Sequence, residues 1–114
     1  MPREVNILSA AAPSSLALVE AGAKIAPDLR VRTLDRVVTE IVDDRGRAVL
    51  SVQMPERVEN AAEIARLAPW ATRAAPAWWT EAWVPWGPTG EVGVAIVQAF
   101  AASIDAQLLV EDGA

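Results

Sequence analysis

The sequence contains no cysteine and no histidine among its 114 residues. The first absence excludes disulfide bonds and thiolate nucleophiles, and the second removes the usual side-chain ligands of zinc, copper and haem. A Ser-His-Asp or Cys-His triad is therefore impossible, and no unperturbed side chain titrates near neutral pH. Catalysis would require a carboxylate with a shifted pKa, Lys24, or a metal ion held by carboxylates. We therefore expect no catalytic residue, no cofactor and no metal ligand.

Basic residues and long apolar runs are also scarce. Ten Lys and Arg residues against fifteen Asp and Glu residues give a net charge of −5, and the sequence pI is near 4.6. Nucleic acids and anionic membrane surfaces are bound through an excess of basic side chains, so this balance disfavours both as partners. No apolar run reaches the roughly 20 residues that cross a bilayer, and the N-terminus does not have the pattern of a signal peptide. We expect a cytoplasmic protein without membrane insertion.

The composition otherwise indicates a folded domain. Hydrophobic residues make up 53% of the chain and charged residues 22%, and the mean hydropathy is +0.23. These values are too apolar for an intrinsically disordered chain. Two domains of about 57 residues each would lie near the limit of independent stability. We therefore interpret residues 1–114 as one domain.

Three segments have the pattern of helices. The first, 14–26, follows a proline and begins with serine, and a proline ends it. The second, 56–68, begins with acidic residues, which are favourable near the positive end of a helix dipole. The third, 89–103, has Thr89 as its expected N-cap and is apolar nearly all round. This last pattern predicts burial against more than one surface.

The clearest strand signal is a hairpin around residues 43–46, Asp-Asp-Arg-Gly, which two β-branched segments flank. Asp43 can accept hydrogen bonds from the turn backbone, and Gly46 can adopt the left-handed conformation that closes a type I turn with a bulge. We interpret the Asp pair as part of this turn and not as a metal or phosphate site.

Further strands are expected at residues 4–10, 77–84 and 107–111, and the extended segment 28–33 is a weaker candidate. The resulting order is β-α-β-β-α-β-α-β. It predicts an α+β domain in which three helices pack on a mixed or antiparallel sheet of four to five strands.

The tryptophans are concentrated in one segment. Five of them fall within 17 residues, namely Trp70, Trp78, Trp79, Trp83 and Trp86. Side chains alternate along a strand, so the segment 77–84 places Trp78 on one face and Trp79, Glu81 and Trp83 on the other. If the face with Trp78 is buried, then Trp79 and Trp83 form an exposed aromatic patch that flanks Glu81.

Exposed tryptophan clusters are typical of interfaces, because tryptophan is enriched among the residues that dominate binding energy. We therefore expect a non-catalytic protein–protein interaction module whose interaction site comprises Trp79, Glu81, Trp83 and Trp86. Through this site the protein would form a homodimer or a complex with another protein. The alternative is a small-ligand binding domain or an enzyme, with an indole-lined pocket and Glu81 or Glu40 as its polar group.

Three segments of the chain carry a family resemblance. They are Leu-Arg-Val-Arg-Thr at 29–33, Asp-Arg-Gly-Arg-Ala-Val-Leu-Ser-Val at 44–52, and Ala-Pro-Ala-Trp-Trp-Thr-Glu-Ala at 75–82. With these segments, the chain resembles an uncharacterised actinobacterial family whose genes often lie near type VII secretion loci. The resemblance implies an association with secretion machinery and brings no catalytic motif.

Overall fold

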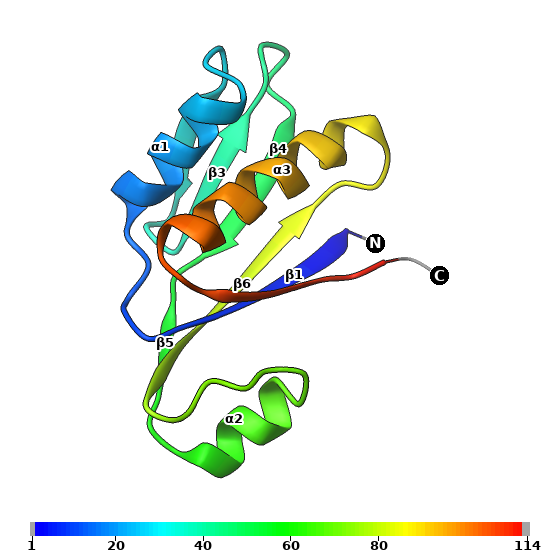
Figure 1. The fold of residues 1–114 in the computed structure, drawn as a ribbon. Coiled ribbons are helices and arrows are strands. Elements are labelled where there is room, and N and C mark those ends of the chain that lie inside the picture. Colours follow the sequence, from blue (N-terminus) through cyan, green and yellow to red (C-terminus); the bar gives the residue numbers. More distant parts are fainter. Residues whose placement is uncertain (1, 113–114) are drawn as a thin grey trace.

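One antiparallel sheet forms the centre of the computed structural model, which describes residues 2–112 of the chain (Figure 1). Within these residues the chain forms seven strands and three helices. In chain order they are β1 (Arg3–Ser9), α1 (Ser15–Ile25), β2 (Arg30–Leu34), β3 (Val38–Val42), β4 (Ala48–Gln53), β5 (Glu56–Val58), α2 (Ala61–Leu67), β6 (Ala77–Val84), α3 (Pro88–Ser103) and β7 (Gln107–Val110). The sheet order is β2-β3-β4-β6-β1-β7, and β5 pairs with the first residues of β6.

The α+β class and the three helices are confirmed, whereas the expected strand count is wrong. The described residues form a sheet of seven strands and not of four to five. Strand β2, only weakly indicated by the sequence, accounts for one of the additional strands. Strand β5 accounts for another, and it occupies the start of the segment that was predicted as the helix 56–68.

The second helix is shorter than predicted because long-range pairing outweighs the local helix signal. Glu56 and Val58 pair with Trp79 and Ala77 of β6, so this stretch is extended. Helix α2 begins only at Ala61, where the side chain of Asn60 caps it by accepting a hydrogen bond from the N–H of Ala62 at 2.7 Å. Helices α1 and α3 lie within one residue of their predicted bounds, although Gly87 and not Thr89 is the N-cap of α3.

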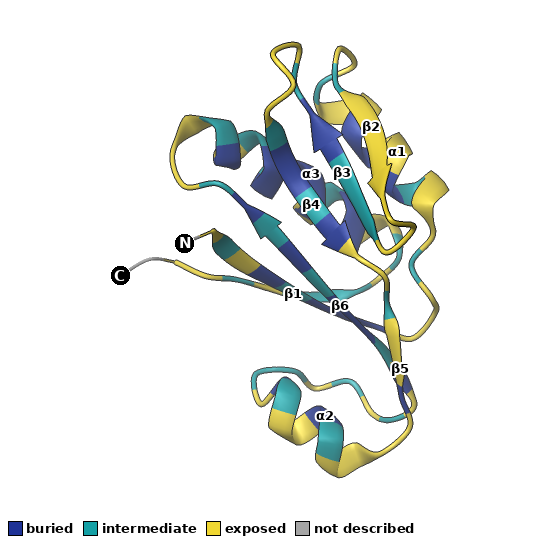
Figure 2. Cartoon of the chain, turned by 180° about the vertical axis from the view of Figure 1, so that it is seen from behind, coloured by how far each residue is buried: buried dark blue, intermediate teal, exposed yellow. Residues whose placement is uncertain are grey.

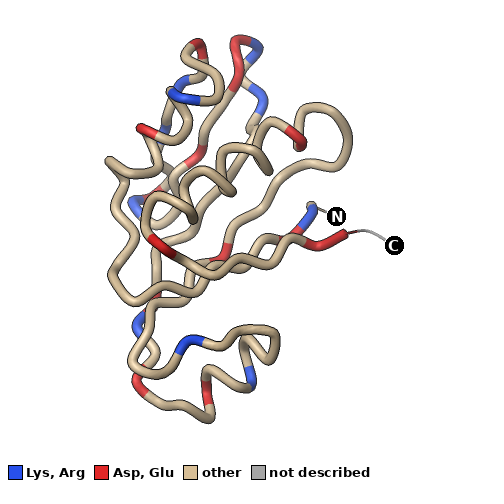
Figure 3. The backbone as a smooth tube through the Cα atoms, viewed as in Figure 1, with Lys and Arg blue, Asp and Glu red and all other residues tan. Residues whose placement is uncertain are grey.

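Helices α1 and α3 pack together on one face of the sheet (Figure 1). The main hydrophobic core fills the space between this helix layer and the sheet, and its members include Val5, Ile7, Leu18, Ile41, Leu50, Ile96, Val97 and Phe100. Figure 3 shows α3 as a segment almost without charge, and Glu91 is its only charged residue. The predicted burial of α3 on several sides is confirmed, because this helix also contacts β4, β6 and β7.

We call the other face of the sheet the open face, because no helix of the described residues lies in front of β1, β3, β4 and β6 there (Figure 2). Helix α2 lies at the far end of the molecule, beside β5. A second, smaller hydrophobic cluster forms there from Leu8, Val58, Ile64, Ala68, Ala77 and Trp79. The sheet is thus covered by helices on one side along most of its width and capped by α2 at one end of the other side.

Close contact between α3 and β4 depends on a glycine. A Cβ atom added at Gly93 would lie 1.9 Å from the carbonyl oxygen of Val49, which is far inside van der Waals contact. The helix backbone therefore lies directly against the backbone of β4, and only a residue without a side chain permits this distance.

The β3–β4 hairpin closes as predicted. The Asp43 Oδ1 atom accepts hydrogen bonds from the backbone N–H groups of Arg45 and Arg47, both at 2.9 Å. The Asp43 Oδ2 atom accepts a further one from Arg47 Nε at 2.9 Å, and Gly46 has the left-handed φ of 75°. These hydrogen bonds, led by the one from the Arg47 backbone, hold the pKa of Asp43 below its ordinary value of 3.8.

We expect Gly93→Ala to lower the free energy of unfolding by about 3 kcal/mol, because the added methyl group must push α3 away from β4. Denaturant unfolding followed by circular dichroism measures this. The matched control is Gly22→Ala in α1, where the nearest atom is the flexible end of Ile41 at 3.2 Å. That variant should stay within about 1 kcal/mol of the wild type, and equal losses in the two variants would contradict the close contact.

Asp43→Asn should be less stable than the wild type at neutral pH, and the difference should shrink as the solution becomes acidic. A carboxylate whose pKa is lowered by folding stabilises the folded state above its unfolded pKa, and this contribution is lost as the pH falls through the folded pKa. Urea unfolding from neutral pH to about pH 2 measures the effect. Asp44→Asn removes the same charge from the neighbouring turn residue and serves as the control. If stability depended on pH in the same way in both variants, the hydrogen bonds to Asp43 would not be the cause of its lowered pKa.

Candidate functional site

Strand β6 separates its side chains into two sets, as the alternation predicts. Ala82 and Val84 belong to the main core beneath α1 and α3. Trp79, Glu81 and Trp83 belong to the opposite set, which lies on the open face. The indole Nε1–H of Trp79 donates a hydrogen bond to Glu81 Oε1 at 3.2 Å, so two of these side chains are directly linked.

The expected exposure of Trp79 is wrong. This side chain is only 6% exposed and packs in the smaller cluster with Val58 of β5 and Ile64 of α2. The partly buried Trp70, which follows α2, packs against the same cluster. Helix α2 and the segment after it cover this end of the open face. The alternation of side chains within β6 cannot predict this, because it does not show which other elements pack on each face. Of the predicted patch, Trp83 is half-buried and Trp86 is 45% exposed.

Trp83 stands in a row of side chains that crosses five strands of the open face. Direct pairing links Arg32 of β2 to Glu40 of β3, Glu40 to Ser51 of β4, and Ser51 to Trp83 of β6. On its other side, Trp83 pairs with Glu4 of β1. The Arg32 Nε atom donates to Glu40 Oε1 at 2.7 Å, and the Ser51 hydroxyl donates to Glu40 Oε2 at 3.1 Å. Glu40 is therefore fully engaged within the sheet surface.

Two hollows meet at Trp83. The first has a volume of about 130 Å³ and is lined by Glu4, Asn6, Trp79, Glu81, Ala82 and Trp83. The second has a volume of about 350 Å³, and Ser51, Trp83, Pro85 and Trp86 are among the residues that line it. We call these two hollows together the Trp83 surface. All four residues predicted for the interaction site border it, with Trp79 as part of its buried wall.

The first hollow is acidic and aromatic. The carboxylates of Glu4 and Glu81 line it, and no Lys or Arg of residues 2–112 forms an ion pair with either. Arg3, the neighbour of Glu4 in the chain, is engaged elsewhere. Its Nη1 atom lies 3.0 Å from Glu91 Oε1, and its guanidinium lies 5.2 Å from the centre of the Trp86 ring. Two carboxylates beside an indole have the chemistry that attracts an organic cation.

Glu4 is the site residue that sequence reasoning missed. Its position in a short strand near the N-terminus is unremarkable, and only the pairing of β1 with β6 places it directly opposite Trp83. In the described part of the chain, no group of three or more acidic side chains is arranged to hold a metal ion. In the same part, no helix is both long enough and apolar enough to span a bilayer.

Comparison with known proteins gives no significant match to a family model, to a curated protein or to a solved structure. The resemblance to the actinobacterial family and the association with type VII secretion therefore stay predictions.

Trp79 and Trp86 should differ sharply in their contribution to stability. We expect Trp79→Ala to lower the free energy of unfolding by about 3–5 kcal/mol, because it leaves a cavity in the cluster beneath α2. Trp86→Ala should cost no more than about 1 kcal/mol, since it removes an exposed ring and one surface contact with Arg3. Urea unfolding of both variants measures this, and equal costs would show that the burial of Trp79 is misassigned.

Proposed function

We propose that the protein is a non-catalytic protein–protein interaction module that binds a basic segment of another protein at the Trp83 surface. The observation that supports this most strongly is the presence of two carboxylates, Glu4 and Glu81, beside the half-buried ring of Trp83 without a cation from the described chain. An arginine or lysine from a partner would supply the missing positive charge.

The first hollow suits the side chain of an arginine. Its guanidinium can donate several hydrogen bonds to Glu4 and Glu81, and charge-assisted hydrogen bonds are stronger than neutral ones. The guanidinium and its apolar stem can also lie against the face of Trp83. The net charge of −5 favours the approach of a basic partner at long range.

The second hollow suits an apolar residue next to the basic one. It is bordered by the rings of Trp86 and Pro85 and shares Trp83 with the first hollow. A segment a few residues long can therefore bury an apolar side chain there while its basic neighbour reaches Glu4 and Glu81. This combination of an aromatic anchor and flanking charges is typical of interfaces in which few residues supply most of the binding energy.

Homodimerisation through the same surface is less favourable than binding to a basic partner. A face-to-face dimer would bring Glu4 and Glu81 of both copies together, and like charges at an interface oppose association. The homodimer expected from the sequence stays a prediction, as does a role beside type VII secretion machinery. The small-ligand alternative uses the same chemistry, with an organic amine in place of the basic segment.

We expect a terminally blocked Gly-Arg-Leu-Arg-Gly peptide to bind, and its Gly-Gln-Leu-Gln-Gly analogue not to bind, in isothermal titration calorimetry. Glu4→Gln and Glu81→Gln should each weaken binding about tenfold, because each removes a charge-assisted contact. Glutamine at position 81 keeps an oxygen that accepts the Trp79 Nε1–H, so the fold is preserved. Added salt should weaken the binding, because the Glu4 site is exposed.

The matched control is Glu20→Gln, which removes an exposed carboxylate from α1 on the other side of the sheet. It should bind the peptide as the wild type does. Equal weakening by Glu20→Gln, or equal binding of the neutral peptide, would contradict the proposal. Light scattering on the eluting protein distinguishes the homodimer, because a dimer that Trp83→Ala converts into a folded monomer would show that a second copy occupies this surface.

A further inference from the structure

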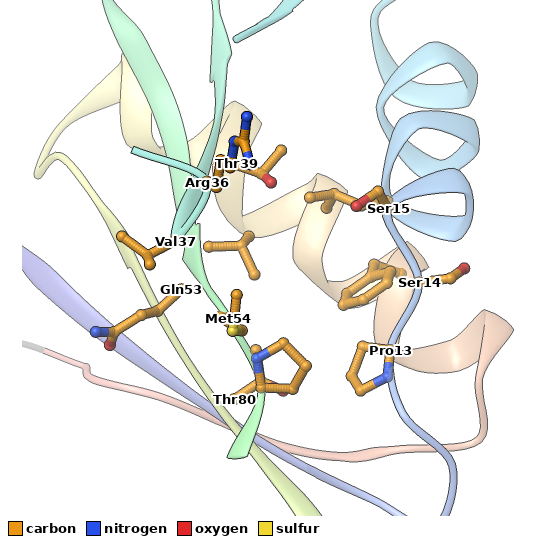
Figure 4. Close-up of a pocket in the computed structure, with 13 residues that line it drawn as sticks. Pro13, Ser14, Ser15, Arg36, Val37, Thr39, Gln53, Met54 and Thr80 are labelled. Atoms are coloured by element: carbon orange, nitrogen blue, oxygen red, sulfur yellow. The ribbon is translucent and has the colours of Figure 1, made fainter. Parts of the chain in front are cut away.

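A cavity of about 140 Å³ lies on the helix-covered side of the sheet, between the start of α1 and the ends of β3 and β4 (Figure 4). We call it the α1 pocket. Pro13, Ser14 and Ser15 form one of its sides, and Arg36, Val37 and Thr39 form the opposite side. It shares no residue with the Trp83 surface, so the two sites are independent.

The α1 pocket has a buried floor and an exposed rim. Leu18, Val52, Thr80 and Phe100 line the floor, and each is at most 7% exposed. The rim contains the exposed residues Ser14, Ser15, Arg36, Val37 and Met54. A cavity with a largely apolar floor and a few polar groups near its opening is the usual form of a small-molecule site.

The hydroxyl of Thr80 on this floor has no hydrogen-bond partner within the described chain, although the residue is 0% exposed. Buried hydroxyls are normally paired, because leaving one unpaired is costly. Ser9, the other fully buried hydroxyl residue among residues 2–112, follows this rule and donates to the carbonyl oxygen of Ala11 at 2.8 Å. Valine is close to threonine in shape and has a methyl group in place of the hydroxyl. If the floor served only to pack the core, valine at position 80 would fill the same space without burying an unpaired hydroxyl.

The rim supplies positive charge. Arg36 is the only residue with a formal charge among those that line the pocket, and its guanidinium has no ion-pair partner in the part of the chain that the structure describes. The first turn of α1 contains no acidic residue, so the positive end of its dipole is not neutralised. Ser14 caps the N–H of Ala17 at 3.1 Å, which leaves the N–H groups of Ser15 and Leu16 without an acceptor inside the helix.

We propose that the α1 pocket binds a small aromatic carboxylate that carries a second polar group at its opposite end. The carboxylate lies at the rim, near Arg36 and the first N–H groups of α1. The ring lies against Phe100 and Leu18, and the second polar group forms a hydrogen bond with the Thr80 hydroxyl. The volume is appropriate, because an apolar cavity of about 150 Å³ holds a benzene ring.

The probe for this proposal is 4-hydroxybenzoate, titrated into the full chain and followed by amide NMR. We expect saturable binding with a Kd of about 1 mM or below, which is an ordinary affinity for a ligand of this size. The amide signals of Ser15, Val37, Met54 and Thr80 should shift, because these residues line the pocket. Benzoate, which lacks the hydroxyl, and phenol, which lacks the carboxylate, should each bind about tenfold more weakly.

Thr80→Val provides the test that separates binding from structure. It should raise the midpoint of thermal unfolding of the free protein, because it replaces an unpartnered buried hydroxyl by a methyl group. It should also remove the preference for 4-hydroxybenzoate over benzoate. Thr33→Val, an exposed substitution on β2, is the matched control and should change neither property.

Arg36→Asn tests the rim, since asparagine tolerates the left-handed φ of 62° found there. It should remove the preference for 4-hydroxybenzoate over phenol, whereas Arg45→Asn in the other hairpin should not. Three results would overturn the proposal: no saturable binding of 4-hydroxybenzoate, unchanged ligand preference in Thr80→Val, or a lowered unfolding midpoint in that variant. The last result would show that the hydroxyl stabilises the fold, for example through a bound water.

Discussion

The pairing of β6 with strands on both of its sides is the constraint on which the rest of the structure depends. Seven of its eight residues pair with β1 on one side, and five pair with β4 or β5 on the other. Alternate side chains therefore lie on opposite faces, with Ala82 and Val84 in the core beneath α1 and α3 and Glu81 and Trp83 on the open face. As a result, two neighbouring residues of β6 line different sites on opposite faces of the sheet. Thr80 lies on the floor of the α1 pocket, and Glu81 borders the Trp83 surface.

The two faces of the sheet are stabilised in different ways. Under the helix layer, apolar packing dominates, and the backbone of α3 contacts β4 directly at Gly93. On the open face, the cluster around Trp79 packs beneath α2 at one end, and cross-strand pairs contribute over the rest. The contacts of Glu40 with Arg32 and Ser51 show how charge is balanced there. Glu4 and Glu81 depart from this balance. Neither carboxylate forms an ion pair with a Lys or Arg of residues 2–112, so a cationic partner can supply the opposite charge.

Local signals in the sequence predicted the elements that depend on local physics. The alternation of 77–84, the turn at 43–46 and the apolar helix near the C-terminus are all present in the structure. Strand β5 was missed because its three residues become a strand only by pairing with β6, about 20 residues later in the chain. The burial of Trp79 depends on α2 in the same way, and the position of Glu4 opposite Trp83 depends on the pairing of β1 with β6. The α1 pocket could not be predicted, since its walls come from separate segments that only the fold brings together.

Each of the two candidate sites contains a polar group that lacks a partner of the expected kind among residues 2–112. Thr80 on the floor of the α1 pocket is a buried hydroxyl without a partner in the described part of the chain, and Glu81 at the Trp83 surface has no ion pair there. The second buried polar side-chain atom without a partner, Nε of Arg73, is a lesser exception, because the same guanidinium donates to the carbonyl oxygen of Asp105. A sequence selected for stability alone would replace Thr80 by valine and pair Glu81 with a cation. Within residues 2–112 the Thr80 hydroxyl has no hydrogen-bond partner and Glu81, which accepts a hydrogen bond from Trp79, has no cation beside it; the two proposed binding partners would complete these groups.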